Sequence, residues 1–159
     1  MADITPHYRS GTPFIAVHDA PAALAFYQDA FGAQPLARLD APDGRVMHAA
    51  LLIHGSPVVV VDEMPEVGLH SPRHYGGTPF SIVLACEDAD AVHDKAVAAG
   101  ARSLASVRDD FSGSRHGLIE CPFGHRWLPT SRAEDLTFGQ IEERFHAWLA
   151  STERPATGR

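Results

Sequence analysis

The sequence lacks most of the features that mark secreted, membrane-bound or nucleic-acid-binding proteins. Its 159 residues include only two cysteines, Cys86 and Cys121, which have no metal-binding or redox spacing. No apolar run is long enough to span a bilayer, and the N-terminus has no basic-then-apolar signal segment. The formal net charge is -7 and no basic run occurs, which disfavours nucleic acid and anionic membranes as partners. We therefore expect a cytoplasmic protein whose cysteines are free thiols.

The chain also lacks an obvious metal-binding motif, although it has ten histidines. No His-Glu-x-x-His pattern occurs. His48 and His54 share one face of a predicted strand, but the strand between them separates them by roughly 20 Å, too far to share an ion. His70 and His74 fall in a loop and are expected at the surface, and His93 belongs to a helical stripe. The histidines therefore give no indication of a bound metal.

What the sequence does contain is a strand–helix–strand–strand–strand unit that occurs twice. The first unit is predicted to have strands at 12–18, 35–40, 45–54 and 58–61. Its helix is expected to begin after Asp19, a good N-cap, and to end at Gly32. Two pairs of segments show the repeat, namely Ala16-Val-His-Asp-Ala20 with Ala85-Cys-Glu-Asp-Ala89, and Gly32-Ala33 with Gly100-Ala101. An internal repeat of this kind indicates two similar halves.

Each unit closes on a strand–turn–strand hairpin. In the second unit the turn is Cys121-Pro-Phe-Gly124, since proline fixes φ early in the turn and glycine permits a positive φ at its end. Gly55 marks the corresponding turn of the first unit. The segment 64–77 is rich in proline, glycine and histidine and is expected to link the units. Thr137-Phe-Gly-Gln140 is a capping box, which predicts the start of a last helix.

These features predict an α+β fold with an additional C-terminal helix. We divide the chain into an N-terminal arm (1–11), a domain (12–132) with units at about 12–63 and 78–131 joined by the linker 64–77, a C-terminal helix (133–151) and a tail (152–159).

Five short motifs indicate a family. They are Ala41-Pro-Asp-Gly-Arg-Val-Met-His48, Val61-Asp-Glu-Met-Pro65, Gly76-Gly-Thr-Pro79, Asp110-Phe-x-Gly-x-Arg115 and Pro122-Phe-Gly-His-x-Trp127. With the repeated unit, they resemble the PhnB-like, glyoxalase/bleomycin resistance branch of the vicinal oxygen chelate (VOC) superfamily. The resemblance runs from about Thr12 to Arg132 and departs from the branch at Cys121, where aspartate is usual. It implies two tandem βαβββ units forming a curved mixed sheet around a cavity, a homodimer and a small-molecule ligand.

Enzymes of this superfamily hold a divalent ion with His, Glu or Gln from the first and last strands of each unit. The ion acts as a Lewis acid on a substrate with two adjacent oxygens. Counting from the capping aspartates and the turn glycines places these four positions at Thr12, Val59, Ser81 and Leu128. Two hydroxyls and two hydrocarbon side chains are not a ligand set for zinc, nickel, manganese or iron. We therefore expect no catalytic metal and no other cofactor.

The strand parities predict one face that packs under the helices and an opposite, mostly apolar face with a few polar groups. This composition is typical of a small-molecule pocket. The residues that we expect to contact a ligand, on this face or beside it, are Phe14, His48, Ala50, Ser81, Phe111, Arg115, Arg126 and Thr130.

Several of these residues also have a purely structural interpretation. His48 would hydrogen-bond a ligand or act as a general base, or else would bond a neighbouring strand or a dimer partner. Arg115 would clamp an anionic ligand group or form a surface ion pair. Phe14 and Phe111 would stack on a planar ligand or fill the core. The final helix, with Trp148, is expected to pack on the domain or on a dimer partner.

Three functions remain open from the sequence. The first is a metal-free binding protein of the bleomycin resistance type that sequesters a hydrophobic or aromatic compound. The second is a lyase, isomerase or oxygenase that uses a non-standard metal site, or His48 with Arg115 or Arg126 for acid–base chemistry. The third is a dimeric module that serves a protein partner and holds no small ligand. Whether the protein is an enzyme is left undecided.

Overall fold

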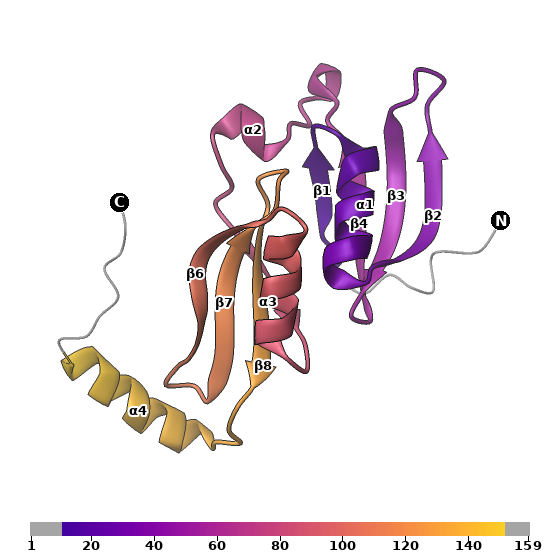
Figure 1. Cartoon of the computed structure of the whole chain (residues 1–159). Coiled ribbons are helices and arrows are strands. Elements are labelled where there is room, and N and C mark those ends of the chain that lie inside the picture. The colour runs from indigo at the N-terminus through magenta and orange to yellow at the C-terminus, as the bar shows by residue number, and fades with distance from the viewer. Residues whose placement is uncertain (1–10, 152–159) are drawn as a thin grey trace.

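The computed structural model describes residues 11–151 and shows two four-stranded sheets side by side, each with a helix on the same side (Figure 1). The first unit comprises β1 (Phe14–Val17), α1 (Ala20–Phe31), β2 (Gln34–Asp40), β3 (Val46–Ile53) and β4 (Ser56–Asp62). Its strand order is β1-β4-β3-β2, with β1 parallel to β4 and the other pairs antiparallel. The predicted strand–helix–strand–strand–strand unit is confirmed.

The second unit repeats this topology. It comprises β5 (Ser81–Ala85), α3 (Ala89–Ala98), β6 (Arg102–Asp109), β7 (Ser114–Glu120) and β8 (Arg126–Arg132). Its order is β5-β8-β7-β6, again with one parallel pair. The α+β class is therefore confirmed, and the strands of the described part of the chain form two separate sheets of four.

The linker adds two short helices, and the C-terminal segment adds a helix of 13 residues. The linker contains η2 (Pro65–Val67) and α2 (Pro72–Tyr75), each opened by a proline at a position where its missing N–H is not needed. The last helix, α4 (Phe138–Ala150), begins at the predicted capping box, with both reciprocal bonds between Thr137 and Gln140 formed. No helix within residues 11–151 has the length and apolar character needed to cross a membrane. The tail at 152–159 and nearly all of the N-terminal arm lie outside the described residues.

The helices of the two units, α1 and α3, begin for the same local reason. The side chain of Asp19 accepts a hydrogen bond from the Ala22 N–H at 3.0 Å, and Asp88 accepts one from the Ala91 N–H at 3.0 Å. Each aspartate satisfies one of the free N–H groups of the first helical turn. Gly32 ends α1 in the left-handed region, at φ +64°, where a side chain would be strained.

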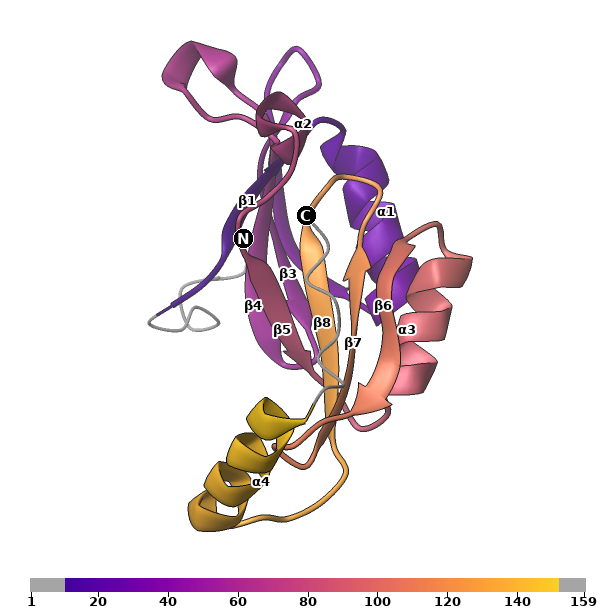
Figure 2. The ribbon, with the colours of Figure 1, turned by 90° about the vertical axis from the view of Figure 1, so that its left-hand side faces the viewer.

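The hydrophobic core lies between the two helices and the two sheets. Alternate strand residues point into it, as their parity predicted: Ile15, Val17, Leu51, Ile53, Val58, Val60, Leu84 and Trp127. One continuous cluster contains residues from both units, so the halves share a core. Figure 2 shows α1 and α3 on one side of the sheets, with α4 lying against one end of the other side. The sheet faces opposite α1 and α3 are therefore the ones available to a ligand.

The turn between β7 and β8 joins the second unit to the first. The ring of Phe123 lies 5.4 Å from that of His18 and 6.3 Å from that of Phe26, measured between centroids. His125 is buried, and its Nε2–H donates to the Ala16 carbonyl at 2.9 Å. This hydrogen bond requires only the neutral imidazole.

The contact between the two units should become less stable in mild acid because His125 is buried there. Burial lowers the pKa of this imidazole below its usual 6.5, so the unfolded chain takes up the proton more readily than the folded chain. The free energy of unfolding should therefore be at its full value above about pH 6.5 and fall by up to about 1.4 kcal/mol per pH unit below it. Urea unfolding between pH 7.5 and roughly 5 measures this. In His125→Gln the slope should be shallower by one proton, and an unchanged slope would contradict the assignment.

Candidate functional site

The second sheet leaves the face opposite α3 accessible, and we call this the open face. Three rows of side chains cross it: Ser81 with Arg126 and Glu120, Val83 with Leu128, and Ala85 with Thr130 and His116. Directly paired residues share a face, so these rows follow from the strand register. Val83, at the centre, is 62% exposed although it is hydrocarbon. The open face is thus an apolar strip with polar rows at both ends.

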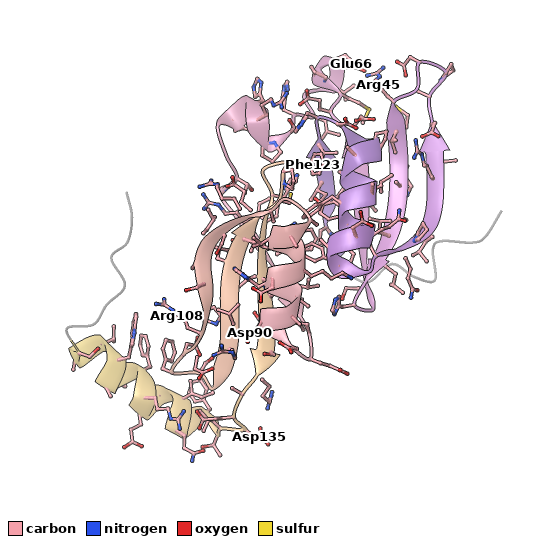
Figure 3. The ribbon with its side chains drawn as sticks, in the orientation of Figure 1. Arg45, Glu66, Asp90, Arg108, Phe123 and Asp135 are labelled. Carbon is pink, nitrogen blue, oxygen red and sulfur yellow. The ribbon has the colours of Figure 1, made fainter. Side chains whose placement is uncertain are left out.

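A pocket of about 570 Å³ lies at one end of the open face, between the β6–β7 hairpin and α4; we call it the α4 pocket. Its lining residues are Arg108, Asp109, Asp110, Phe111, His116, Arg144, Ala147 and Trp148. The rings of Phe111 and Trp148 lie 5.4 Å apart at an interplanar angle of 39°, and form an aromatic wall. Figure 3 shows Arg108 on β6, on the side of the sheet edge that faces α4. The pocket therefore combines aromatic surface with cationic side chains.

Most charges around the α4 pocket are already paired. Glu134 holds Arg144 through two hydrogen bonds of 2.8 Å, and Asp110 accepts from both the N–H and the hydroxyl of Ser112. Asp110 also lies 3.5 Å from Nδ1 of His116. Within residues 11–151, Arg108 has no carboxylate in salt-bridge range and its side chain is exposed. Arg108 is therefore the cation with most freedom to meet an anionic group of a ligand.

The residues predicted from the sequence as ligand contacts are divided among four places. Ser81, Arg126 and Thr130 lie on the open face, and Phe111 lies in the α4 pocket. The hydroxyl of Thr130 donates to the Leu128 carbonyl of its own strand at 2.9 Å. Ser81, Arg126 and Thr130 share one face of the second sheet as the strand parity predicted, and Phe111 lies in the turn between β6 and β7, whereas the remaining four residues do not join them.

The corresponding face of the first sheet is largely covered by the linker. Met64 and Leu69 pack against Ala16, Val59 and Val61 there. Ala50 is 0% exposed on this face and has no surface to offer a ligand. His48 is half-buried opposite Leu39, and Phe14, on the edge strand β1, is 53% exposed. The first unit therefore contributes little open surface, because the chain between the units fills it.

Arg115 lies on the other side of β7, beneath α3. Its guanidinium donates to Asp90 of α3, with one bond of 2.8 Å, and to Asp109 at 3.0 Å. These bonds raise the pKa of Arg115 and lower the pKa of Asp90, since each favours the charged form of its partner. Of its two sequence-based interpretations, the structure shows the ion pair, and the side chain is directed away from the open face.

The four positions that carry metal ligands in enzymes of the resembling family do not suit an ion. Val59 is 3% exposed and packs in the hydrocarbon cluster with Met64 and Leu69. Leu128 pairs with Val83 across the open face. Within residues 11–151 no three His, Cys, Asp or Glu side chains gather closely enough to hold a metal ion. The donor set therefore does not fit a divalent transition metal.

The cysteines do not form a reactive centre. The thiol of Cys121 lies 3.6 Å from the Tyr27 hydroxyl in the core. Burial raises the pKa of both groups, and it also raises the pKa of the Cys86 thiol. Thiols with raised pKa values are poor nucleophiles near neutrality. This agrees with the interpretation of both residues as free structural thiols.

Sequence reasoning missed the contribution of α4 and a histidine pair. Trp148 was expected only in packing, and Arg108 and His116 were given no role, although strand alternation places them on the open side with Thr130. The rings of His70 and His74 stack at a centroid distance of 3.8 Å in the linker, where His70 lies outside α2 and no periodic pattern indicates the contact.

Comparisons with known proteins agree with the fold. The model of the Glyoxalase/Bleomycin resistance protein/Dioxygenase superfamily matches residues 6–128. The uncharacterized protein Mb0911c of Mycobacterium bovis is 36% identical over 134 residues, which are 82% of this chain and 88% of that protein. The uncharacterized protein At5g48480 of Arabidopsis thaliana is 30% identical over 122 residues, 72% of this chain and 73% of that protein. The crystal structure of TioX from Micromonospora sp. ML1 superposes with a TM-score of 0.61 at 25% identity and covers 81% of this chain and all (100%) of its own. The protein therefore belongs to the glyoxalase/bleomycin resistance protein/dioxygenase superfamily.

Proposed function

We propose that the protein binds a hydrophobic or planar aromatic small molecule along the open face and in the α4 pocket, without a catalytic metal. The observation that carries this proposal is the pocket itself, in which Phe111 and Trp148 form an aromatic wall beside the exposed guanidinium of Arg108. Pockets of this size with aromatic lining and a few polar groups are typical of small-molecule sites. Sequestration needs shape and apolar area, and no reactive group.

Within the superfamily, we assign the chain to the metal-free, PhnB-like branch of the bleomycin resistance type. The motifs quoted above and the hydrocarbon environment of Val59 and Leu128 support this assignment. A role in resistance to an aromatic antibiotic, a cytoplasmic location and a homodimer belong to the same proposal. Support for a dimer comes from the apolar groups left exposed near the open face, such as Phe80 (48%) and Val83.

The alternative function, an enzyme, requires acid–base or nucleophilic side chains, and the open face provides only some of them. His116 and Thr130 are paired there, but His116 already lies near Asp110. Arg126 lies 3.6 Å from Glu120. Burial raises the pKa of the Cys86 and Cys121 thiols, so neither cysteine supplies an activated nucleophile. A binding role therefore accounts for the site with fewer assumptions than catalysis.

A planar aromatic carboxylate such as 2-naphthoate should bind and change the fluorescence of Trp148, while the buried Trp127 supplies a constant background. Trp148→Ala should weaken binding about tenfold or more, since stacking on an indole is lost. Arg108→Gln should weaken 2-naphthoate but leave the neutral analogue 2-naphthylmethanol unchanged, because only the carboxylate meets the guanidinium. Isothermal titration calorimetry measures the affinities of the wild type, Trp148→Ala and Arg108→Gln.

The control variant is Phe138→Ala, because Phe138 lies on the same helix outside the pocket and is 79% exposed. Its affinity should equal that of the wild type. Equal losses in both α4 variants would show that the pocket is not the site. Binding should also survive a chelator, and a stoichiometric metal ion whose removal abolishes binding would favour the enzyme alternative.

A further inference from the structure

A second cavity, of about 440 Å³, lies at the opposite end of the open face from the α4 pocket. α2 of the linker forms one side, and the β7–β8 turn, where Figure 3 labels Phe123, forms another. The β1–α1 connection contributes His18. Gly100 and Arg102, between α3 and the start of β6, complete the lining. Four segments that are distant in the sequence therefore meet around this space, which we call the arginine cavity.

The charge of the arginine cavity is opposite to that of the protein. Arg73, Arg102 and Arg126 line it, whereas Glu120 is its one carboxylate among the described lining residues. The whole chain has a formal net charge of -7. Three guanidinium groups beside a single carboxylate leave a local excess of positive charge in an acidic protein. Such an excess favours an anionic occupant.

Glu120 does not neutralise the three arginines. One of its oxygens accepts from Arg102 at 2.9 Å, and the other lies 3.6 Å from Nε of Arg126, beyond hydrogen-bond range. Arg73, on α2, is exposed and has no carboxylate in salt-bridge range within residues 11–151. The guanidinium groups of Arg73 and Arg126 therefore retain donors for another acceptor.

Two buried polar atoms at the cavity also lack a partner within residues 11–151. They are Nε of Arg126 and Nδ1 of His18. A buried donor that stays unsatisfied costs free energy, and most such groups in proteins are paired with protein, water or a ligand. An oxyanion in the arginine cavity would supply acceptors to the Arg126 donor.

The backbone around the cavity is held in place by close packing. A Cβ added at Gly124, which has φ +85°, would meet Cβ of Pro72 at 2.8 Å, so the turn lies directly against α2. This contact fixes the helix that carries Arg73 over the strand that carries Arg126. The arrangement of the arginines is thus built into the fold, and does not depend only on their own flexible side chains.

From these observations we propose that the arginine cavity is a binding site for a small phosphorylated ligand, recognised through its phosphate oxygens by Arg73, Arg102 and Arg126. Guanidinium groups present planar pairs of N–H donors that match phosphate oxygens, and a phosphate dianion balances the excess charge. The site is separate from the aromatic α4 pocket, which lies at the other end of β8. The two sites are therefore tested with different probes.

Pyrophosphate is the probe for this site, and citrate is the carboxylate comparison. Calorimetry should show pyrophosphate binding at millimolar concentrations or below, more tightly than citrate. Arg73→Gln should weaken pyrophosphate about tenfold, the typical cost of one charge-assisted hydrogen bond. Glu120→Gln should strengthen it, since the variant removes the competing carboxylate and frees Arg102. The matched control is Arg38→Gln, because Arg38 is an exposed, ion-paired arginine on β2 that does not line the cavity.

The site would be supported if pyrophosphate affinity falls in Arg73→Gln, rises in Glu120→Gln and is unchanged in Arg38→Gln. Absence of pyrophosphate binding, or equal weakening in both arginine variants, would overturn it, since the latter indicates general charge attraction. Tighter binding of citrate than of pyrophosphate would overturn the phosphate assignment. Circular dichroism of each variant checks folding, which the exposed positions of Arg73 and Arg38 should leave unaffected.

Discussion

Replacing Trp127 by alanine should lower the free energy of unfolding by about 4 kcal/mol, the largest effect expected for a single substitution in this chain. Trp127 lies on β8 and is 1% exposed. Its ring centroid is 4.9 Å from that of Phe31 and 5.4 Å from that of Tyr27, both on α1. The indole of the second unit thus packs against the helix of the first. Its removal would leave a cavity at the place where the two halves share their core.

The two tryptophans of the chain provide a matched comparison for this prediction. Trp148 contacts Phe111 and Phe145, but α4 contains no buried residue, so Trp148→Ala should cost about 1 kcal/mol or less. Urea unfolding followed by circular dichroism measures both variants. Similar losses would show that α4 is as much a part of the core as β8. A split transition in Trp127→Ala would show that the halves unfold separately once their contact is weakened.

The fold was predictable because local and long-range signals agree in this sequence. Asp19 and Asp88 each stand before a helix and cap it, and alternation along β3 and β4 places Leu51, Ile53, Val58 and Val60 in the core beneath the helices, although Val59 and Val61 on the other face are buried as well. The capping box at Thr137 marks the start of α4. These signals act over a few positions and depend little on the rest of the chain. When local preferences agree with the tertiary structure in this way, secondary structure and topology can be predicted from the sequence.

The candidate site was less predictable because it depends on contacts between distant residues. Arg115 pairs with Asp90, which lies 25 positions earlier and on a different element, so strand parity alone did not show that its guanidinium is occupied. The linker covers Val59 through Met64 and Leu69, although its composition shows no periodicity. The α4 pocket exists because the chain returns to the β6–β7 hairpin after β8. None of these contacts between distant segments can be recognised from a single sequence.

Asp62→Ala should lower the free energy of unfolding by about 3 kcal/mol, although Asp62 contributes no apolar packing. One carboxylate oxygen accepts from the Ala20 N–H and the other from the Val46 N–H, both at 2.7 Å. Ala20 opens α1 and Val46 opens β3, and both residues are 0% exposed. Alanine at position 62 would leave two buried N–H groups unsatisfied, each of which costs about 1–3 kcal/mol.

The repeat supplies the control for this second prediction. Ser131 lies at the end of β8 as Asp62 lies at the end of β4, and its hydroxyl accepts from the Ala89 N–H, the first residue of α3, at 3.4 Å. A single, longer bond to a neutral group is weaker, so Ser131→Ala should cost about 1 kcal/mol or less. Equal losses at the two positions, measured by urea unfolding, would contradict the role of the bridging carboxylate. The expected difference arises because the first unit uses one carboxylate to anchor both its helix and its hairpin, whereas the second uses a hydroxyl to anchor the helix alone.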